Sequence, residues 1–251
     1  MRVAVAGATG NIGKRTVAAL RRDGHEVVRI SRSFGVDLRT GDGLDDALTG
    51  VDAVVDATNA PVADRAGTVD YFATTTANLL AAGARAGVGH HVLLSIVGIN
   101  DIEDVAGNAH YAGKQEQERL VADGPVPWTI VPCTQFHDFA AMVAGWTEQD
   151  GAATIAPLLV RPIAPDDVAD VLAEVAVGTP QGRYADVAGP ETQDLVDMAR
   201  RTHAARGHTV RLVPTWDGIF GTHMAGNVLL PGKNARITPT TFDEWLTTET
   251  S

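Results

Sequence analysis

Cysteine is almost absent from this chain of 251 residues, in which Cys133 stands alone. A single thiol excludes an internal disulfide, so a folded state must depend on a hydrophobic core. No apolar run approaches the roughly 20 residues of a membrane-spanning helix. The segment ahead of Gly7 is too short for a secretory signal. These absences predict a cytoplasmic protein with no membrane partner.

Positive charge is also scarce, because 20 Lys and Arg face 31 Asp and Glu and give a formal net charge of -11. Binding to nucleic acid requires basic surface to neutralise phosphates, so we expect no nucleic-acid partner. The histidines lack the spacing of metal ligands, and we expect no metal site. Hydrophobic residues make up 45% of the chain, as in a globular domain.

The first half of the sequence alternates short apolar runs with longer helical ones. The expected strands are residues 2–6, 26–31, 52–57, 91–97 and 128–131, and the expected helices are 11–22, 44–48, 68–86 and 111–122. Alternation of this kind favours parallel strands joined by right-handed crossovers. The pattern predicts an α/β fold with a doubly wound, Rossmann-like parallel sheet.

The second half is less regular. It suggests a helix capped by Asp166 and Asp167 and running to residue 177, strands at 184–188 and 210–213, a helix at 192–206, a loop or lid at 216–233 and a closing turn of helix at 243–247. No linker-like tract interrupts the chain. We therefore expect a single domain over 1–251, with a Rossmann core over about 1–135 and a small C-terminal substrate lobe over about 136–251.

A glycine-rich loop follows the first strand directly and opens the first helix. A strand-to-helix turn needs a residue free to take positive φ, a second glycine leaves room for a pyrophosphate, and a third lets the helix pack closely. Free amides at the helix start would bind the phosphates. The predicted cofactor contacts in this loop are Gly7, Thr9, Gly10, Asn11, Ile12 and Gly13.

The end of the second strand distinguishes the two nicotinamide cofactors. A carboxylate there would bind the ribose 2′-hydroxyl of NAD(H), whereas arginine accommodates the 2′-phosphate of NADP(H). The residues present are Ser31, Arg32 and Ser33, with no carboxylate among them. An arginine fork flanked by hydroxyls favours NADP(H) over NAD(H).

Two further segments are expected along the path of the cofactor. Asp37 could bind the adenine amino group, with Leu38 packed on the ring. Thr58, Asn59 and Ala60 end the third strand, where the middle of the cofactor would cross the sheet edge. Turn chemistry explains either segment equally well.

Several motifs in order resemble a known family. They are GATGNIG, ISRS, DAVVDATNA, HVLLSIVGI and AHYAGKQEQERL, and together they are similar to the atypical short-chain dehydrogenase/reductase superfamily, in particular its NmrA-like NAD(P)-binding members. The likeness covers about the first 140 residues and continues loosely through PIAPDDVADVL and TTFDEWL. The family's fold and its use of NAD(P) are what this resemblance implies.

The resemblance also implies catalytic roles. In that superfamily a tyrosine is the general acid, a lysine four residues later holds the nicotinamide ribose and lowers the tyrosine pKa, and a serine on the fourth strand polarises the substrate carbonyl. The matching lysine is Lys114, which would also contact the cofactor, and the matching serine is Ser95. The position four before Lys114 is His110, and Tyr111 lies three before it.

Helix geometry leaves the proton donor open. Positions three and four before Lys114 lie about 60° and 40° from it on opposite sides, so Tyr111 or His110 could face the nicotinamide. If neither does, the cofactor binds without turnover. Simpler explanations also stand: an exposed Lys114 paired with Glu118, and Ser95 satisfying a buried strand end.

The segment after the fifth strand should border the nicotinamide, since ligands of doubly wound folds bind at the carboxyl ends of the strands. Phe136, His137 and Trp146 are the predicted substrate-binding residues, although core packing would explain the aromatic side chains as well.

The functional hypothesis is an NADP(H)-dependent oxidoreductase acting on a small, partly apolar carbonyl or enone. One alternative is a non-catalytic NAD(P)-binding redox sensor, which some NmrA-like proteins are, and another is a nicotinamide-dependent isomerase or epimerase. The expected partner is a small-molecule substrate, and the expected assembly is a monomer or homodimer.

Overall fold

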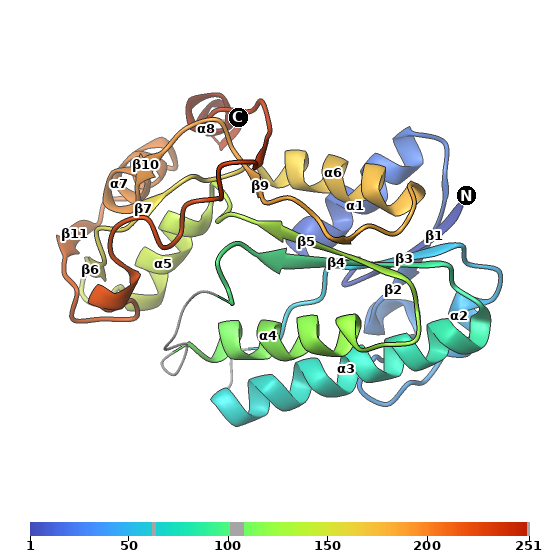
Figure 1. Ribbon diagram of the computed structural model, residues 1–251. Coiled ribbons are helices and arrows are strands. Elements are labelled where there is room, and N and C mark those ends of the chain that lie inside the picture. The colour runs from blue at the N-terminus through green and yellow to red at the C-terminus, as the bar shows by residue number, and fades with distance from the viewer. Residues whose placement is uncertain (62–63, 101–107, 250–251) are drawn as a thin grey trace.

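The computed structural model describes residues 1–61, 64–100 and 108–249 (Figure 1). Its first half consists of parallel strands with intervening helices. The strands are β1 (Arg2–Ala6), β2 (Glu26–Ile30), β3 (Ala53–Asp56), β4 (His90–Ile96) and β5 (Trp128–Cys133). The helices are α1 (Asn11–Arg22), α2 (Leu44–Leu48), α3 (Arg65–Ala86) and α4 (Ala109–Ala122), with a 3₁₀ turn, η1, at Arg32–Phe34. The α/β fold expected from the sequence is confirmed.

Strand order in the main sheet is β12-β9-β5-β4-β3-β1-β2, and every pairing along it is parallel. The chain moves from β1 outward to β2, then returns across β1 to β3 and continues in the opposite direction. The order therefore reverses between β1 and β3. In doubly wound sheets, the crevice at such a reversal is where a ligand binds.

Helices cover both faces of this sheet (Figure 1). One core lies between the sheet and α1 together with α6 (Pro165–Val177), and includes Val3, Val5 and Leu172. A second lies under α2, α3 and α4 and includes Leu79 and Val121. Because β1 and β3 are buried on both faces, their sequences are nearly continuous apolar runs and do not alternate with polar residues. None of the helices in the described ranges is both long and apolar enough to cross a bilayer.

The second half of the chain returns to the main sheet. The short strands β8 (Gly182–Arg183), β9 (Val187–Ala188) and β12 (Arg236–Ile237) extend it beyond β5, and α6 packs beside α1. A boundary near residue 135 therefore does not separate core from lobe, because residues 165–188 and 236–237 belong to the sheet and its covering layer. Pairings this short and this distant in sequence leave little local signal.

The remaining elements form a smaller lobe around its own core. They are α5 (Phe139–Thr147), β6 (Ala152–Ile155), β7 (Leu159–Val160), β10 (Gln193–Asp194), α7 (Leu195–Ala205), β11 (Arg211–Pro214), the 3₁₀ turn η3 (Thr222–Met224) and α8 (Phe242–Glu249). Phe220 and Met224, from the segment expected to be a loop or lid, are buried in this core with Phe242 and Trp245.

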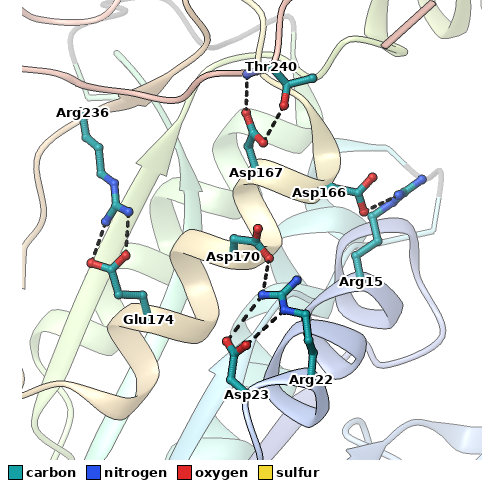
Figure 2. A network of polar contacts seen from close by, with 9 residues as sticks. All are labelled: Arg15, Arg22, Asp23, Asp166, Asp167, Asp170, Glu174, Arg236 and Thr240. Carbon is teal, nitrogen blue, oxygen red and sulfur yellow. Dashed lines mark hydrogen bonds and ion pairs between the residues drawn. The ribbon is translucent and has the colours of Figure 1, made fainter. Parts of the chain in front are cut away.

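The start of α6 corrects one prediction. Ala164 is the N-cap and Pro165 the first helical residue, so Asp166 and Asp167 lie in the first turn and do not cap it. Figure 2 shows what they bind instead: Asp166 pairs with Arg15 of α1 at 2.5 Å, and Asp167 accepts from the Thr240 hydroxyl at 2.8 Å.

The same face of α6 carries two more acidic residues. Asp170 pairs with Arg22 of α1 at 3.0 Å, and Glu174 pairs with Arg236 of β12 at 2.6 Å (Figure 2). Each exposed pair contributes little to stability on its own, because solvent screens the charges. Together they join α6 to α1 on one side and to the C-terminal segment on the other.

Candidate functional site

The glycine loop is shaped by close backbone contacts. Gly7 has φ +75°, and a Cβ there would lie 2.6 Å from the Ala57 carbonyl oxygen of the neighbouring chain segment. A Cβ at Gly13 would overlap the Gly7 carbonyl. The sequence argument for these two glycines, positive φ and close helix packing, is therefore confirmed by the geometry.

The N-terminus of α1 is prepared for an anion. Its N-cap is Gly10, which offers no side-chain cap, and its first turn holds no acidic residue. The first amides of the helix therefore lack the usual side-chain acceptor. Thr9, Gly10 and Asn11 are exposed, while Ile12 anchors the helix in the core. Free amides and a positive helix end fit a diphosphate.

Asn11 links this loop to the lobe. Its Nδ2 donates to Asp138 Oδ2 at 3.0 Å, and Asp138 is the N-cap residue of α5. Its Oδ1 accepts from Arg15 Nε at 3.2 Å. The Asn11 side chain is thus bonded to Asp138 and Arg15, which leaves its backbone amide as the group available to a phosphate.

At the end of β2 the residues expected to distinguish NADP(H) from NAD(H) form η1. Ser31 Oγ and Ser33 Oγ are 2.8 Å apart. Arg32 is exposed and forms no ion pair with any residue of the described ranges. A free guanidinium beside two hydroxyls suits a phosphate dianion.

The two segments predicted along the cofactor path are both held by turn chemistry. Asp37 Oδ1 accepts from the Arg39 amide at 2.8 Å, and the Leu38 carbonyl accepts from Asn78 Nδ2 at 2.9 Å. Leu38 packs on the core under α2 and α3.

The second segment follows β3. The Thr58 hydroxyl donates to Asp56 Oδ1 at 2.6 Å. Asn59 is exposed and Ala60 is half-buried, so both remain accessible at the sheet edge. The turn contacts hold this segment beside Gly7, at the reversal of strand order.

Lys114 is a buried lysine, 4% exposed, and not the exposed partner of Glu118 that a simpler explanation assumed. Its Nζ donates to the Leu94 carbonyl at 2.6 Å and to Gln117 Oε1 at 2.5 Å. Gln117 Nε2 in turn donates to Asp56 Oδ2 at 2.9 Å. Burial lowers the pKa of Lys114 to about 8, opposed by the charges of Asp56 and Glu118.

Sequence reasoning missed Gln117 and Asp56 as partners of Lys114. Gln117 lies three residues after Lys114, on the same side of the helix, so spacing alone could have identified it. Asp56 could not be found this way, because its contact depends on how α4 packs against β3.

Ser95 is engaged elsewhere. Its hydroxyl donates to Glu118 Oε1 at 2.5 Å, and the other carboxylate oxygen of Glu118 accepts from Asn100 at 2.8 Å and from Arg183 at 2.8 Å. Ser95 is thus part of a polar network around the buried Glu118 carboxylate, which reaches the surface at Arg183. Its proton is directed at a carboxylate, whereas the resemblance assigns it to a substrate oxygen.

His110 and Tyr111 face different neighbours, although Asn108 Oδ1 caps both of their amides. The His110 ring contacts the Phe72 ring of α3, with 5.8 Å between the two centroids. Lys114 Nζ lies 5.4 Å from the centroid of the Phe72 ring. Tyr111 instead packs into the lobe core. His110 and Lys114 thus share Phe72 as a neighbour, whereas Tyr111 lies on the side of α4 that faces the lobe.

Burial governs the pKa of both candidate proton donors. It raises the pKa of Tyr111 to about 12, with the neighbouring Gln135 side chain acting in the opposite direction. Burial and the charge of Lys114 lower the pKa of His110 to about 4. Both side chains are therefore neutral near pH 7, and it is Gln135, not Lys114, that opposes the rise of the Tyr111 pKa.

The three residues predicted to bind substrate lie apart. Phe136 packs against the core under α1 and α6. His137 is 1% exposed, donates to the Thr240 carbonyl at 3.2 Å and contacts Trp245, so its surroundings are those of a packed core residue. Trp146 is 54% exposed on α5 and touches Phe139 edge-on. Only Trp146 offers open apolar surface.

Comparison with known proteins identifies the family. Residues 7–177 match the family model described as NAD(P)H-binding. A protein of Mycobacterium tuberculosis is 29% identical over 188 residues, which are 70% of this chain and 18% of that protein. This chain therefore corresponds to less than a fifth of that relative's length.

Solved structures share the fold. A nucleoside-diphosphate-sugar epimerase of Staphylococcus aureus superposes with a TM-score of 0.71 at 16% identity, covering 98% of this chain and 99% of the other. An NADPH-dependent quinone oxidoreductase of Escherichia coli, solved with NADPH, gives 0.65 at 19% identity, covering 85% and 78%. With its glycine loop, its strand order and the family match in agreement, the chain belongs to the NAD(P)H-binding family, within the NmrA-like part of the atypical short-chain dehydrogenase/reductase superfamily.

Proposed function

We propose that this protein is an NADP(H)-dependent oxidoreductase acting on a small, partly apolar carbonyl or enone. The observation that carries the proposal is the uncapped start of α1 at the reversal of strand order, with Arg32 just after β2, where it has no ion-pair partner among the described residues. The first feature supports a dinucleotide diphosphate and the second a 2′-phosphate. A bound nicotinamide would supply or accept the hydride.

The chain's own residues would then bind, orient and protonate. Amides of the glycine loop would bind the diphosphate, and Lys114 would hold the nicotinamide ribose by turning from Gln117. Tyr111 holds a proton at neutral pH and is the proposed donor to the substrate oxygen, with His110 as the alternative. Exposed Trp146 offers apolar surface to a substrate.

Removing the Arg32 guanidinium tests the cofactor preference. Arg32→Ala should weaken NADPH binding about 10- to 100-fold, since a charge-assisted contact to phosphate contributes about 1.5–3 kcal/mol. NADH binding should change little, because NADH has no 2′-phosphate. Calorimetric titration of both nucleotides measures the difference. Arg21→Ala, on the exposed last turn of α1, removes the same charge and should affect neither; equal losses of NADPH and NADH in Arg32→Ala would refute the preference.

A paired substitution tests catalysis and its proton donor. Oxidation of NADPH is followed with a panel of quinones, aldehydes and enones, and Tyr111→Phe should lower kcat about 100-fold, the usual contribution of a general acid. NADPH affinity should be retained, because the loop that binds the diphosphate is unchanged. A larger loss in His110→Phe than in Tyr111→Phe would transfer the role to His110.

A non-catalytic redox sensor is the second candidate, and one observation favours it. Ser95 donates to Glu118, Lys114 donates to Gln117, and Tyr111 is buried in the lobe core. Such an arrangement suits binding without turnover. Discrimination between NADPH and NADP⁺ together with no activity on any member of the panel would support this role over the enzyme.

A further inference from the structure

Gln135 lies just beyond β5, in a segment whose backbone is fixed on both sides. The Gln135 carbonyl accepts from the Ile163 amide at 2.9 Å, and the His137 amide donates to the Ile163 carbonyl at 3.0 Å. The preceding Thr134 amide donates to Val187 at 3.0 Å. The side chain therefore projects from a rigid position at the carboxyl end of a central strand.

That side chain is buried without a well-formed hydrogen bond in the described ranges. Gln135 is 7% exposed, and neither its Nε2 nor its Oε1 meets hydrogen-bond geometry with a described residue, although the Tyr111 side chain lies near enough to interact with it. Buried amides are nearly always satisfied, because leaving both a donor and an acceptor unpaired destabilises the fold. An unpaired amide at a strand end suggests a ligand that completes it.

The neighbourhood of Gln135 is the side of the site opposite to Arg32. Strand order places β5 and β4 beyond β3, away from β2. A dinucleotide with its adenosine at β2 and its diphosphate at Gly10 would extend its other end toward β4 and β5. Gln135 also lies close enough to Tyr111 to act on the hydroxyl of the proposed proton donor.

We propose that the Gln135 side chain binds the carboxamide of the nicotinamide ring, with Nε2 donating to its oxygen and Oε1 accepting from its nitrogen. This assignment rests on the proposed function. Two primary amides are complementary, because each has an NH2 group that donates and a carbonyl oxygen that accepts. A lone carbonyl oxygen of a substrate would satisfy Nε2 only and leave Oε1 unpaired.

The role of Gln135 is to fix which face of the ring is presented to Tyr111. Ser95 is not available for this purpose, since its hydroxyl is directed at Glu118. Gln135 makes no such well-formed bond in the described ranges, and Tyr111, its one neighbour named above, is itself part of the proposed site. It is a binding residue, and its effect should be measurable without turnover.

The test compares two oxidised cofactors that differ only at the carboxamide. In the 3-acetylpyridine analogue of NADP⁺, a methyl group replaces the amide nitrogen, so the oxygen remains and the donor is lost. The wild type should bind NADP⁺ about tenfold more tightly than the analogue, the effect of one hydrogen bond. In Gln135→Met, which keeps the length of the side chain, the ratio should fall to about one.

Three controls separate the outcomes. Binding of 2′,5′-ADP, which lacks nicotinamide, should be unchanged in Gln135→Met. Thr76→Val removes a buried hydroxyl that has no hydrogen-bond partner in the described ranges, and it should keep the wild-type ratio. The urea midpoint of Gln135→Met should equal or exceed that of the wild type, because two unpaired polar atoms are removed; Gln135→Leu serves if the methionine variant does not fold.

Each result decides between the two proposals. If the wild type binds NADP⁺ and 2′,5′-ADP but the variant keeps the tenfold ratio, the Gln135 assignment is overturned and the proposed function stands. If the wild type binds neither nucleotide, both proposals are overturned. A ratio near one in the wild type itself would also exclude a donor-and-acceptor contact.

Discussion

Gly13→Ala is expected to destabilise the fold by about 2–3 kcal/mol and to weaken NADP(H) binding at least about 100-fold, because overpacking of a close contact costs this much and distorts the loop. The added methyl group would overlap the Gly7 carbonyl, so the start of α1 must move away from β1. The amides that would bind the diphosphate move with it. Urea denaturation and calorimetric titration with NADPH measure the two effects.

Gly145→Ala is the matched control, since Gly145 also lies in a helix but a Cβ there meets nothing within 4 Å. Alanine replaces glycine in an exposed helix with a gain of about 0.5–1 kcal/mol. The two substitutions are chemically identical and should change stability in opposite directions. Retention of NADPH binding in Gly13→Ala would remove the glycine loop from the cofactor site.

Loss of Lys114 is expected to have the largest effect on turnover. Lys114→Met should lower kcat/KM about 1000-fold, since it removes the cation proposed to hold the ribose, a contribution of about 4 kcal/mol. In the wild type, activity should decline above about pH 8, where the ammonium loses its proton. A wild-type pH profile that stays flat through pH 9 would show that activity does not depend on the charge of Lys114.

The same pKa predicts how stability changes with pH. Lys114 titrates near 8 in the folded chain and near its ordinary 10.5 when unfolded. Between these values the unfolded chain binds more protons, so the free energy of unfolding contributed by Lys114 rises with pH, by up to about 3 kcal/mol. Below pH 8 the contribution is constant. The effect is isolated by subtracting the free energy of unfolding of Lys114→Met from that of the wild type, at pH 7 and again at pH 10. If this difference is the same at both pH values, folding does not shift the pKa of Lys114.

The groups that surround Lys114 set the direction of this shift. Asp56 from β3 and Glu118 from its own helix favour the charged form, and so does Cys133 from β5, whereas burial opposes it and prevails. His110 responds in the opposite sense, because the nearby ammonium disfavours a second positive charge. The pKa of His110 is therefore expected to rise in Lys114→Met, because the neighbouring positive charge is removed.

The first half of the fold could be predicted because its signals are local. Apolar runs, glycine spacing and helical periodicity identify β1 to β5 within a few residues. Asp64, which caps α3 through the Gly67 amide at 2.8 Å, marks a helix start three residues earlier than expected. The backbone geometry of the glycine loop was predicted for the same reason, since positive φ at Gly7 and close packing at Gly13 depend on consecutive residues.

The second half and the catalytic groups depend on contacts that sequence spacing does not encode. The two-residue strands β8, β9 and β12 exist only because they add to β5. Likewise, Tyr111 and His110 were equivalent on a helical wheel, and only the packing of α4 between α3 and the lobe distinguishes them. Asp138 could be identified as a partner of Asn11 only from the structure, across 127 positions.

The late position of α6 in the chain has a consequence for synthesis on the ribosome. Strands β1 to β5 are complete by Cys133, but the helix that covers one face of β3, β4 and β5 begins only at Pro165. Until then the apolar side chains beneath it, including Val55 and Val131, lack their covering layer. A nascent chain paused in this interval would expose apolar surface to solvent. Chaperone binding is therefore expected to be strongest while residues 134–164 are being synthesised, and to end once α6 has emerged.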